Sequence, residues 1–490
     1  MSLSFDPTKI TFPSGHFVGG KLINDQPKIP LYRPSDGVEF AGSPIADANM
    51  VDQAVQTAKQ ALKTSGWGQC QPRERTIVLQ KWADLIIDNG QELAQLETVP
   101  STRLISQLIQ GDIAVTAEQI RFFAELADKE GGALLPTSES TMGMSITEPY
   151  GVVGAITPWN FPISMAGWKL GPALAAGNAV VLKPSEMTPF TTIRMAELAI
   201  EAGVPEGLIN IVLGDGPTTG NAITGHPDIA KVSFTGSTVT GQAIMENIAR
   251  SGVKPMTLEL GGKSPQVVFA DADLDLAARC IASAITYNAG QACVTGSRII
   301  VHADVEAQLI ERLIPLMSNF TPGPAWNENT DYSPIISEKQ LARLETLVQQ
   351  SVAQGAELCL GGERYDTPGY FYKPTLLTGL DQNNVAIREE IFGPVLSLQT
   401  FNDFQEAMML ADHPVYGLCA GVYTQDLSTA LNATKHIEAG TVWVNRYGRS
   451  RDHILPTGGY KSSGIGKDLG REAYHANRRS KTVLIDHQFS

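Results

Sequence analysis

Residues 151–182, GVVGAITPWNFPISMAGWKLGPALAAGNAVVL, pass from a short apolar run through a helical stretch to a second apolar run. Apolar runs that alternate with helical stretches are typical of βα units that build a parallel sheet. The alternation continues downstream, with further runs at 209–213, 231–234 and 257–260. The sequence therefore predicts a protein of the α/β class with a doubly wound, Rossmann-like layer that binds a nucleotide.

A second α/β domain is expected downstream, because further apolar runs and helical stretches follow between residues 261 and 460. A chain of 490 residues is also too long for one hydrophobic core, since single cores stop growing near roughly 250–300 residues. We predict a nucleotide-binding domain made of residues 1–130 and 151–258, and a catalytic domain made of residues 259–462.

Two segments alternate like strands but lie outside both series, namely residues 131–150 and the tail at 481–486. Unpaired strand edges attract other chains, so we expect a partner subunit to cover them. We assign residues 131–150 and 463–490 to a small β oligomerisation element. Homodimer and homotetramer both stay open.

The composition excludes several classes of protein. A formal net charge of −14 disfavours nucleic acid, whose binding depends on lysine and arginine contacts to phosphate. No apolar stretch reaches the roughly 18 residues of a membrane span, and the first residues do not resemble a secretory signal. The five cysteines are scattered and contain no CxxC pair. We therefore expect neither a metal site nor a disulfide framework, and a reducing cytoplasm fits best.

Three polar residues stand in short motifs that suit chemistry: Asn160 in TPWNFP, Glu259 in LELGGKSP and Cys293 in NAGQACVT. A cysteine thiolate attacks carbonyl carbon, a carboxylate at a strand end can act as a general base, and a side-chain amide can donate to an oxyanion. Each residue alone also fits a structural role, as a buried thiol, a surface glutamate or an asparagine in a turn.

Taken together, PWNFP, LELGGKSP, NAGQAC and EEIFGPV in this order resemble the aldehyde dehydrogenase superfamily. The resemblance extends from about residue 51 to Gly470, and the spacing from Glu259 to Cys293 is typical of that family. It implies a non-acylating enzyme that oxidises an aldehyde to the carboxylic acid with NAD(P).

The resemblance also implies the role of each catalytic residue. Cys293 attacks the aldehyde, and its oxyanion is held by Asn160 and the backbone amide of Cys293. After hydride transfer to the nicotinamide, Glu259 activates the water that hydrolyses the thioester. Lys169 matches a position that relays protons with Glu259. A local lowering of the pKa of the Cys293 thiol is expected to activate it.

The cofactor is expected to be NAD. A carboxylate at Glu186 would repel the 2′-phosphate of NADP, although Lys183 and Ser185 leave NADP open. Glu390 is expected to hold the nicotinamide ribose, and Ser237 the pyrophosphate at a helix start. The full set of positions that the resemblance assigns to the cofactor is Ile156, Trp159, Lys183, Ser185, Glu186, Gly236, Ser237, Leu260, Glu390 and Phe392.

The aldehyde itself is less well specified. The positions that match the family's substrate tunnel are Val115, Phe161, Trp168, Tyr287, Ala292, Val294 and Thr457. Three aromatic rings among them suit a betaine aldehyde or an aminoaldehyde through cation–π attraction. Thr457 weakens that interpretation, because most relatives carry an aromatic residue there.

A basic run at residues 446–453, RYGRSRDH, suits another class of aldehyde substrate. One of its arginines could bind the carboxylate of an anionic semialdehyde, and a solvated loop is the alternative. The chain departs from the family pattern at VPST, residues 99–102, where relatives carry Gly-Lys, which puts a local role there in doubt.

The candidate catalytic residues disfavour two alternative functions. A CoA-acylating enzyme passes the thioester to CoA and needs no water-activating carboxylate, so Glu259 speaks against it. A structural or binding relative that has lost turnover is disfavoured by the presence of Cys293, Asn160, Glu259 and Glu390 together.

Overall fold

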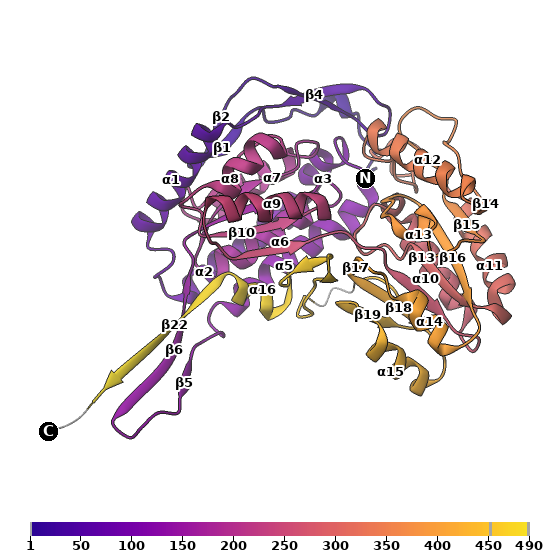
Figure 1. Ribbon diagram of the computed structural model, residues 1–490. Helices are drawn as coiled ribbons and strands as arrows, with labels where there is room; N and C mark the ends of the chain where they lie inside the picture. The colour runs from indigo at the N-terminus through magenta and orange to yellow at the C-terminus, as the bar shows by residue number, and fades with distance from the viewer. Residues whose placement is uncertain (1, 450–452, 488–490) are drawn as a thin grey trace.

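The computed structural model describes residues 2–449 and 453–487, which form an α/β protein with two large sheets (Figure 1). Within these residues the first sheet has eight strands in the order β2 (Lys21–Ile23), β1 (His16–Val18), β9 (Ile209–Ile211), β8 (Ala179–Lys183), β7 (Val152–Ile156), β10 (Lys231–Thr235), β11 (Met256–Glu259) and β21 (Gly464–Ile465). The apolar runs predicted from the sequence are the parallel strands β7 to β11. The predicted fold class is confirmed.

β7 lies at the point where the order of the strands in this sheet reverses. The chain passes from β7 to β8 and β9 on one side, and then returns to place β10 and β11 on the other side. β7, β8 and β10 are buried along their whole length, as expected of parallel strands covered on both faces. Open parallel sheets bind ligands outside the carboxyl ends of their strands at such a reversal.

Helices pack against this sheet and against one another. α6, which leaves β7 towards β8, is buried on all sides, and it begins at Pro162, where the missing N–H is not needed. The helices of this part are α1 (Ala48–Ser65), α2 (Pro72–Asp88), α3 (Gly90–Thr98), α4 (Ile105–Gln107), α5 (Ile113–Leu126), α6 (Pro162–Ala175), α7 (Phe190–Ala202), α8 (Asn221–Gly225) and α9 (Thr238–Ser251).

The second sheet has seven strands within the described residues, and all neighbours are parallel except the edge pair β14 and β15. Its order is β14 (Glu357–Leu360), β15 (Thr375–Thr378), β16 (Val395–Phe401), β13 (Arg298–His302), β12 (Pro265–Val268), β18 (Cys419–Tyr423) and β19 (Thr441–Val444). The helices between its strands are α10 (Leu274–Thr286), α11 (Glu306–Ser318), α12 (Glu338–Ala353), α13 (Val385–Arg388), α14 (Phe404–Ala411) and α15 (Leu427–His436).

The two strand-like segments outside both series pair with each other. β6 (Thr141–Pro149) lies between β22 (Arg478–Asp486) and β5 (Ala133–Leu135) in an antiparallel sheet that projects from the body (Figure 1). The range 463–490 does not belong wholly to this sheet, because β21 pairs with β11 and α16 (Gly470–Ala476) packs on α6. The division into domains stays a prediction.

Smaller elements complete the described chain: η1 (Pro7–Lys9), η2 (Leu108–Asp112), η3 (Gly216–Gly220), η4 (Tyr287–Gly290), η5 (Ala303–Val305), and the two-stranded pairs β3 (Ile29–Tyr32) with β4 (Glu39–Ser43) and β17 (Tyr416–Gly417) with β20 (Tyr460–Lys461). None of the helices described is both long enough and apolar enough to cross a membrane.

Candidate active site

Cys293 lies on a loop between α10 and β13 whose backbone is strained. Just before it, Asn288 and Ala289 have φ angles of 51° and 50°, and Gly290 has a φ of 70°. Left-handed backbone costs a non-glycine residue roughly 1–2 kcal/mol. Gly290 also allows a close approach, because a Cβ there would lie 2.2 Å from the carbonyl oxygen of Gly393. The surrounding structure must therefore hold this loop in place.

Hydrogen bonds from distant segments hold the loop. Thr102 Oγ1 donates to Asn288 Oδ1 at 2.6 Å, and Asn288 Nδ2 donates to the carbonyl oxygen of Asn160 at 3.2 Å. The side-chain amide of Gln291 donates to the carbonyl oxygen of Pro334 at 2.9 Å. The loop that presents the thiol is thus fixed from three sides.

No separate role was predicted for Thr102, Asn288 or Gln291. The available signals were the NAGQACVT motif, which contains Asn288 and Gln291, and the departure from the family pattern at residues 99–102. The contact between Thr102 and Asn288 gives this segment a role, because it ties α3 and its following turn to the nucleophile loop.

Asn160 lies close to the nucleophile loop, as its predicted role requires. Its side chain is buried, and Nδ2 donates to the carbonyl oxygen of Gln291 at 3.0 Å. A primary amide has two N–H groups. One is therefore engaged with the loop that carries Cys293, and the other is available for a substrate oxygen.

Cys293 is half-buried and lines a cavity, and burial raises the pKa of its thiol. Glu259 and Glu390 raise this pKa further, whereas the Arg449 guanidinium and the N–H of Val294 lower it. The expected lowering of the thiol pKa is wrong for this arrangement, because loss of hydration outweighs the nearby positive charge.

Glu259 ends β11 with 4% of its surface exposed, and burial raises the pKa of its carboxyl group to about 8. Its Oε1 atom has no hydrogen-bond partner among the described residues. Asp468 raises this pKa and Lys169 lowers it. A carboxyl group with this pKa can take a proton from water in its carboxylate form, which becomes populated as pH rises toward about 8.

Lys169 is buried in α6 rather than exposed, and it forms an ion pair with Asp468. Both groups act electrostatically on Glu259, so the predicted proton-relay residue lies in the right neighbourhood. Asp468 was not selected from the sequence, because a single aspartate before a leucine carries no recognisable motif. Its position became apparent only from the ion pair.

Several of the residues assigned to the cofactor lie along the carboxyl edge of the eight-stranded sheet. Ile156 ends β7, Lys183 ends β8, and Gly236 and Ser237 connect β10 to α9. The first turn of α9 offers backbone N–H groups, which suits a pyrophosphate. Val239 in that turn is 75% exposed and offers an apolar surface to the adenine ring. The N–H groups of this turn and the side chain of Val239 therefore fit a dinucleotide.

The residues expected at the adenosine ribose form a compact polar group. Lys183 Nζ donates to the carbonyl oxygen of Pro184 at 3.0 Å and to Glu186 Oε2 at 3.3 Å, and burial lowers the pKa of this lysine. Ser185 Oγ accepts from the N–H of Met187 at 3.3 Å. A carboxylate and an ammonium side by side suit the two hydroxyls of a ribose.

Glu390 and Phe392 come from the segment after α13 and reach the residues that follow β11. Glu390 Oε1 accepts from the N–H of Gly262 at 2.9 Å, and burial raises the pKa of its carboxyl group to about 7. The Phe392 ring meets Trp159 edge to face, with centroids 5.5 Å apart. Leu260 is buried one residue beyond β11. These contacts bring the segment after α13 to the residues that follow β11 and to Trp159, which follows β7.

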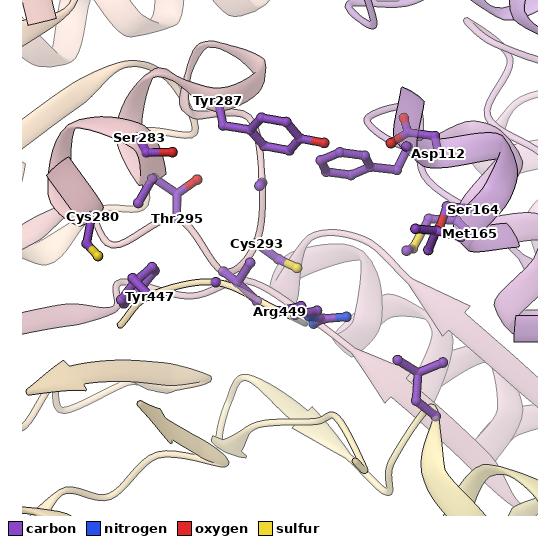
Figure 2. A pocket seen from close by; sticks show the side chains of 18 of the residues that line it. Asp112, Ser164, Met165, Cys280, Ser283, Tyr287, Cys293, Thr295, Tyr447 and Arg449 are labelled. Carbon is purple, nitrogen blue, oxygen red and sulfur yellow. The ribbon is translucent and has the colours of Figure 1, made fainter. Parts of the chain in front are cut away.

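A cavity of about 640 Å³ leads to Cys293 (Figure 2). The described residues that line it include the following predicted substrate positions: Val115, Phe161, Trp168, Tyr287, Ala292 and Val294. Thr457 is not among the described lining residues. Its backbone instead exchanges hydrogen bonds with Asp468, with N···O distances of 2.6 and 2.8 Å. Thr457 therefore does not lie with the other predicted substrate positions.

The basic run at 446–453 is only partly at this cavity. Arg449 and His453 line it, whereas Arg446 is exposed and is not among the described lining residues. Arg451 lies outside the described residues. The described part of the chain contains no cluster of His, Cys, Asp or Glu suited to a metal ion, and its five cysteines are free thiols.

Comparisons with known proteins agree with this geometry. Residues 22–483 match the model of the aldehyde dehydrogenase family. An aldehyde dehydrogenase from Aspergillus niger is 39% identical over 96% of this chain and 95% of its own length. The structure of the NAD+ complex of aldehyde dehydrogenase from Bacillus cereus is 37% identical, covers 100% of both chains and has a TM-score of 0.96.

A longer relative is also similar. A cytosolic 10-formyltetrahydrofolate dehydrogenase from Xenopus tropicalis is 35% identical over 98% of this chain and 54% of its own length. The chain thus spans about half the length of this relative.

Proposed function

The chain belongs to the aldehyde dehydrogenase family, and on this premise we propose that it oxidises an aldehyde to the carboxylic acid with NAD, with Cys293 as the nucleophile. The observation that carries the proposal is the approach of three groups from distant segments. Glu259 lies close enough to Cys293 to raise the pKa of its thiol, and Asn160 donates to the loop two residues before it.

Cys293 begins the reaction. Its sulfur forms a bond to the aldehyde carbon, and the carbonyl oxygen becomes an oxyanion. The available N–H of Asn160 and the backbone N–H of Cys293 stabilise that oxyanion. Burial raises the pKa of the thiol, so its proton passes to water as the sulfur attacks, and the nearby charge of Arg449 favours the thiolate.

NAD, when bound, supplies the acceptor for the hydride that leaves the former aldehyde carbon. Lys183 and Glu186 would hold the adenosine ribose, and the negative charge of Glu186 would favour NAD over the 2′-phosphate of NADP. Glu390 would hold the nicotinamide ribose, and Phe392 would help to orient the nicotinamide. The role of these side chains is to orient the cofactor and keep water from the reacting carbon.

Hydrolysis of the thioester completes the cycle. Glu259 takes a proton from water, the water oxygen bonds to the acyl carbon, and the C–S bond breaks to release the acid and the Cys293 thiolate. A CoA-acylating enzyme would need no base here, so the buried carboxyl group of Glu259 argues against that alternative. The intact catalytic set likewise argues against a relative without turnover.

The test is NADH absorbance with a panel of aliphatic, aromatic, cationic and anionic aldehydes. We expect the wild-type chain to reduce NAD with at least one of them, and Cys293→Ala to form no NADH. Cys359→Ala, at an exposed thiol on β14, is the matched control and should keep wild-type activity. Equal turnover by Cys293→Ala, or the absence of NADH with every aldehyde in the wild type, refutes the proposal.

Two further features of the function are part of the proposal. The chain forms a homo-oligomer, dimer or tetramer, through the projecting sheet of β5, β6 and β22, which exposes apolar side chains. It works in a reducing compartment such as the cytoplasm, because the nucleophile and the other described cysteines are free thiols.

A further inference from the structure

The aromatic rings of the cavity already contact cationic side chains of the chain itself. The rings of Phe161 and Tyr287 stack with centroids 6.0 Å apart, and Arg103 Cζ lies 4.6 Å from the first centroid and 4.7 Å from the second. Arg449 Cζ lies 4.5 Å from the centroid of Trp168. A cationic aldehyde placed among these rings would therefore meet like charge.

The charge of Arg103 is compensated. This arginine is fully buried, and its Nε and Nη2 donate to the two carboxylate oxygens of Asp112 at 2.7 and 3.2 Å. Nη2 also donates to the Tyr287 hydroxyl at 2.6 Å. Asp112 is the one carboxylate among the described residues that line the cavity, and Arg103 neutralises it.

The charge of Arg449 is not compensated in this way. Arg449 is half-buried, lines the cavity, and forms no ion pair or hydrogen bond with any residue of the described ranges 2–449 and 453–487. Figure 2 places it beside Cys293, and its charge lowers the pKa of that thiol. A second arginine, the exposed Arg279, lines the same cavity. Among the described lining residues, Arg449 and Arg279 therefore carry positive charge against the single carboxylate of Asp112, which Arg103 already neutralises.

A second unused donor lies in the same wall. The indole Nε1 of Trp168 is buried and has no hydrogen-bond partner among the described residues. Buried donors are nearly always paired in folded proteins, and an unpaired one costs stability. A guanidinium and an indole N–H are both donors without acceptor capacity. A ligand that engages them must bring acceptor atoms.

We propose that this cavity selects an aldehyde that also carries a carboxylate, which Arg449 binds through its forked N–H groups while the carbonyl reaches Cys293. Arg pairs with carboxylate through two parallel hydrogen bonds, which fixes the orientation of the bound molecule as well as its affinity. Stacking on Trp168 holds the guanidinium plane in place before the substrate arrives. The inference rests on the proposed aldehyde oxidation, because it names the substrate class of the same site.

The first experiment compares each acid with its uncharged ester. We would measure kcat/KM for succinic and glutaric semialdehyde, for their methyl esters, and for a trimethylammonium aldehyde of similar length. We expect each acid to exceed its ester by about tenfold or more, the size expected from one charge-assisted hydrogen bond. The cationic aldehyde should be the poorest of the set.

Variants assign this preference to Arg449. Arg449→Met should bring the ratio of acid to ester close to one, and Arg449→Lys should keep only part of it, because an ammonium lacks the fork. Arg446→Met removes an exposed arginine from the same loop and should leave the ratio as in the wild type. The ratio of kcat/KM for the acid to kcat/KM for its ester is the readout. Loss of Arg449 also changes the electrostatics at Cys293, and that change affects both substrates alike.

A binding measurement separates this inference from the proposed function. Succinate should slow alkylation of Cys293 by iodoacetamide more than its uncharged dimethyl ester does, and Arg449→Met should remove the difference. This readout needs no NAD reduction. Esters that react as well as acids, or an unchanged ratio in Arg449→Met, overturn the inference while aldehyde oxidation stands. Protection by succinate without NADH formation from any aldehyde overturns the proposed function instead.

Discussion

At the scale of single residues, the protonation of Glu259 depends on its burial and on charged neighbours of both signs. Burial raises the pKa of its carboxyl group to about 8, Asp468 raises it further, and Lys169, Arg449 and Lys467 lower it. The general base needs the carboxylate form, so water activation should increase as pH rises through this pKa. If Glu259 is the base that we propose, the buried pair of Lys169 and Asp468 should shift the pH range in which the thioester is hydrolysed.

Substitutions in this pair should move the pH profile in opposite directions. Asp468→Asn removes a negative charge that disfavours the carboxylate, so the rise in kcat should occur at lower pH. Lys169→Met removes a positive charge that favours the carboxylate, so the rise should occur at higher pH. Steady-state rates between pH 6 and 10 check both. Shifts in the same direction would contradict the assignment of Glu259 as the titrating base.

Removal of the base itself should separate the two halves of the reaction. Glu259→Gln keeps the shape of the side chain but cannot take a proton from water. We expect a burst of NADH of about one equivalent per active site, followed by a steady rate at least about a hundredfold lower than in the wild type. Stopped-flow absorbance measures both phases. Continued fast turnover without a burst would mean that another group activates the water.

At the scale of elements, the strained loop before Cys293 depends on segments far away in the sequence. The left-handed backbone of Asn288 and Ala289 is maintained by contacts to the turn after α3 and to the loop that carries Asn160. Strain of this kind persists only where the surroundings impose it. The thiol is thus positioned by tertiary contacts rather than by local preference.

Loss of one such contact should disturb catalysis more than folding. Thr102→Val leaves the buried Asn288 Oδ1 without its donor, which costs about 1–3 kcal/mol. We expect kcat/KM to fall roughly tenfold or more with modest loss of thermal stability, and Thr102→Ser to restore activity. Thr98→Val removes a buried hydroxyl that has no described hydrogen-bond partner and serves as the control. Similar losses in both valine variants would contradict a positioning role for Thr102.

At the scale of the whole molecule, the projecting sheet of β5, β6 and β22 has no cover within the described chain. Leu135 and Leu484 flank Gly143 on one face and are 45% and 66% exposed. Apolar strands exposed in this way mark an interaction surface. A second copy of the chain is the partner that we propose for it.

Charge on that face should prevent assembly. The double substitution Leu135→Lys and Leu484→Lys should lower the mass measured by light scattering to that of one chain, because it places positive charges against an apolar interface. Leu431→Lys, on exposed α15, is the control and should leave the mass unchanged. An unchanged oligomer in the double variant would show that another surface holds the subunits together.

Much of the fold could be predicted from the sequence, because its signals are local. The apolar runs became β7 to β11 at nearly the expected residues, since buried parallel strands need continuous apolar side chains. The motifs around Asn160, Glu259 and Cys293 marked candidate catalytic residues in the same way. Glycines and prolines there impose turns that short-range reasoning can recognise.

The sequence by itself determined the class of fold and selected the candidate residues for the chemistry, because apolar periodicity and turn motifs act over a few positions. Only the tertiary structure decided their environment. Lys169 meets Asp468 across 299 positions, and Thr102 meets Asn288 across 186. The tertiary structure also raises the pKa of the Cys293 thiol, where a lower pKa was expected. It places Arg449 at the cavity and leaves Thr457 away from it. Burial and charge compensation depend on which distant segments pack together, and no local pattern encodes that.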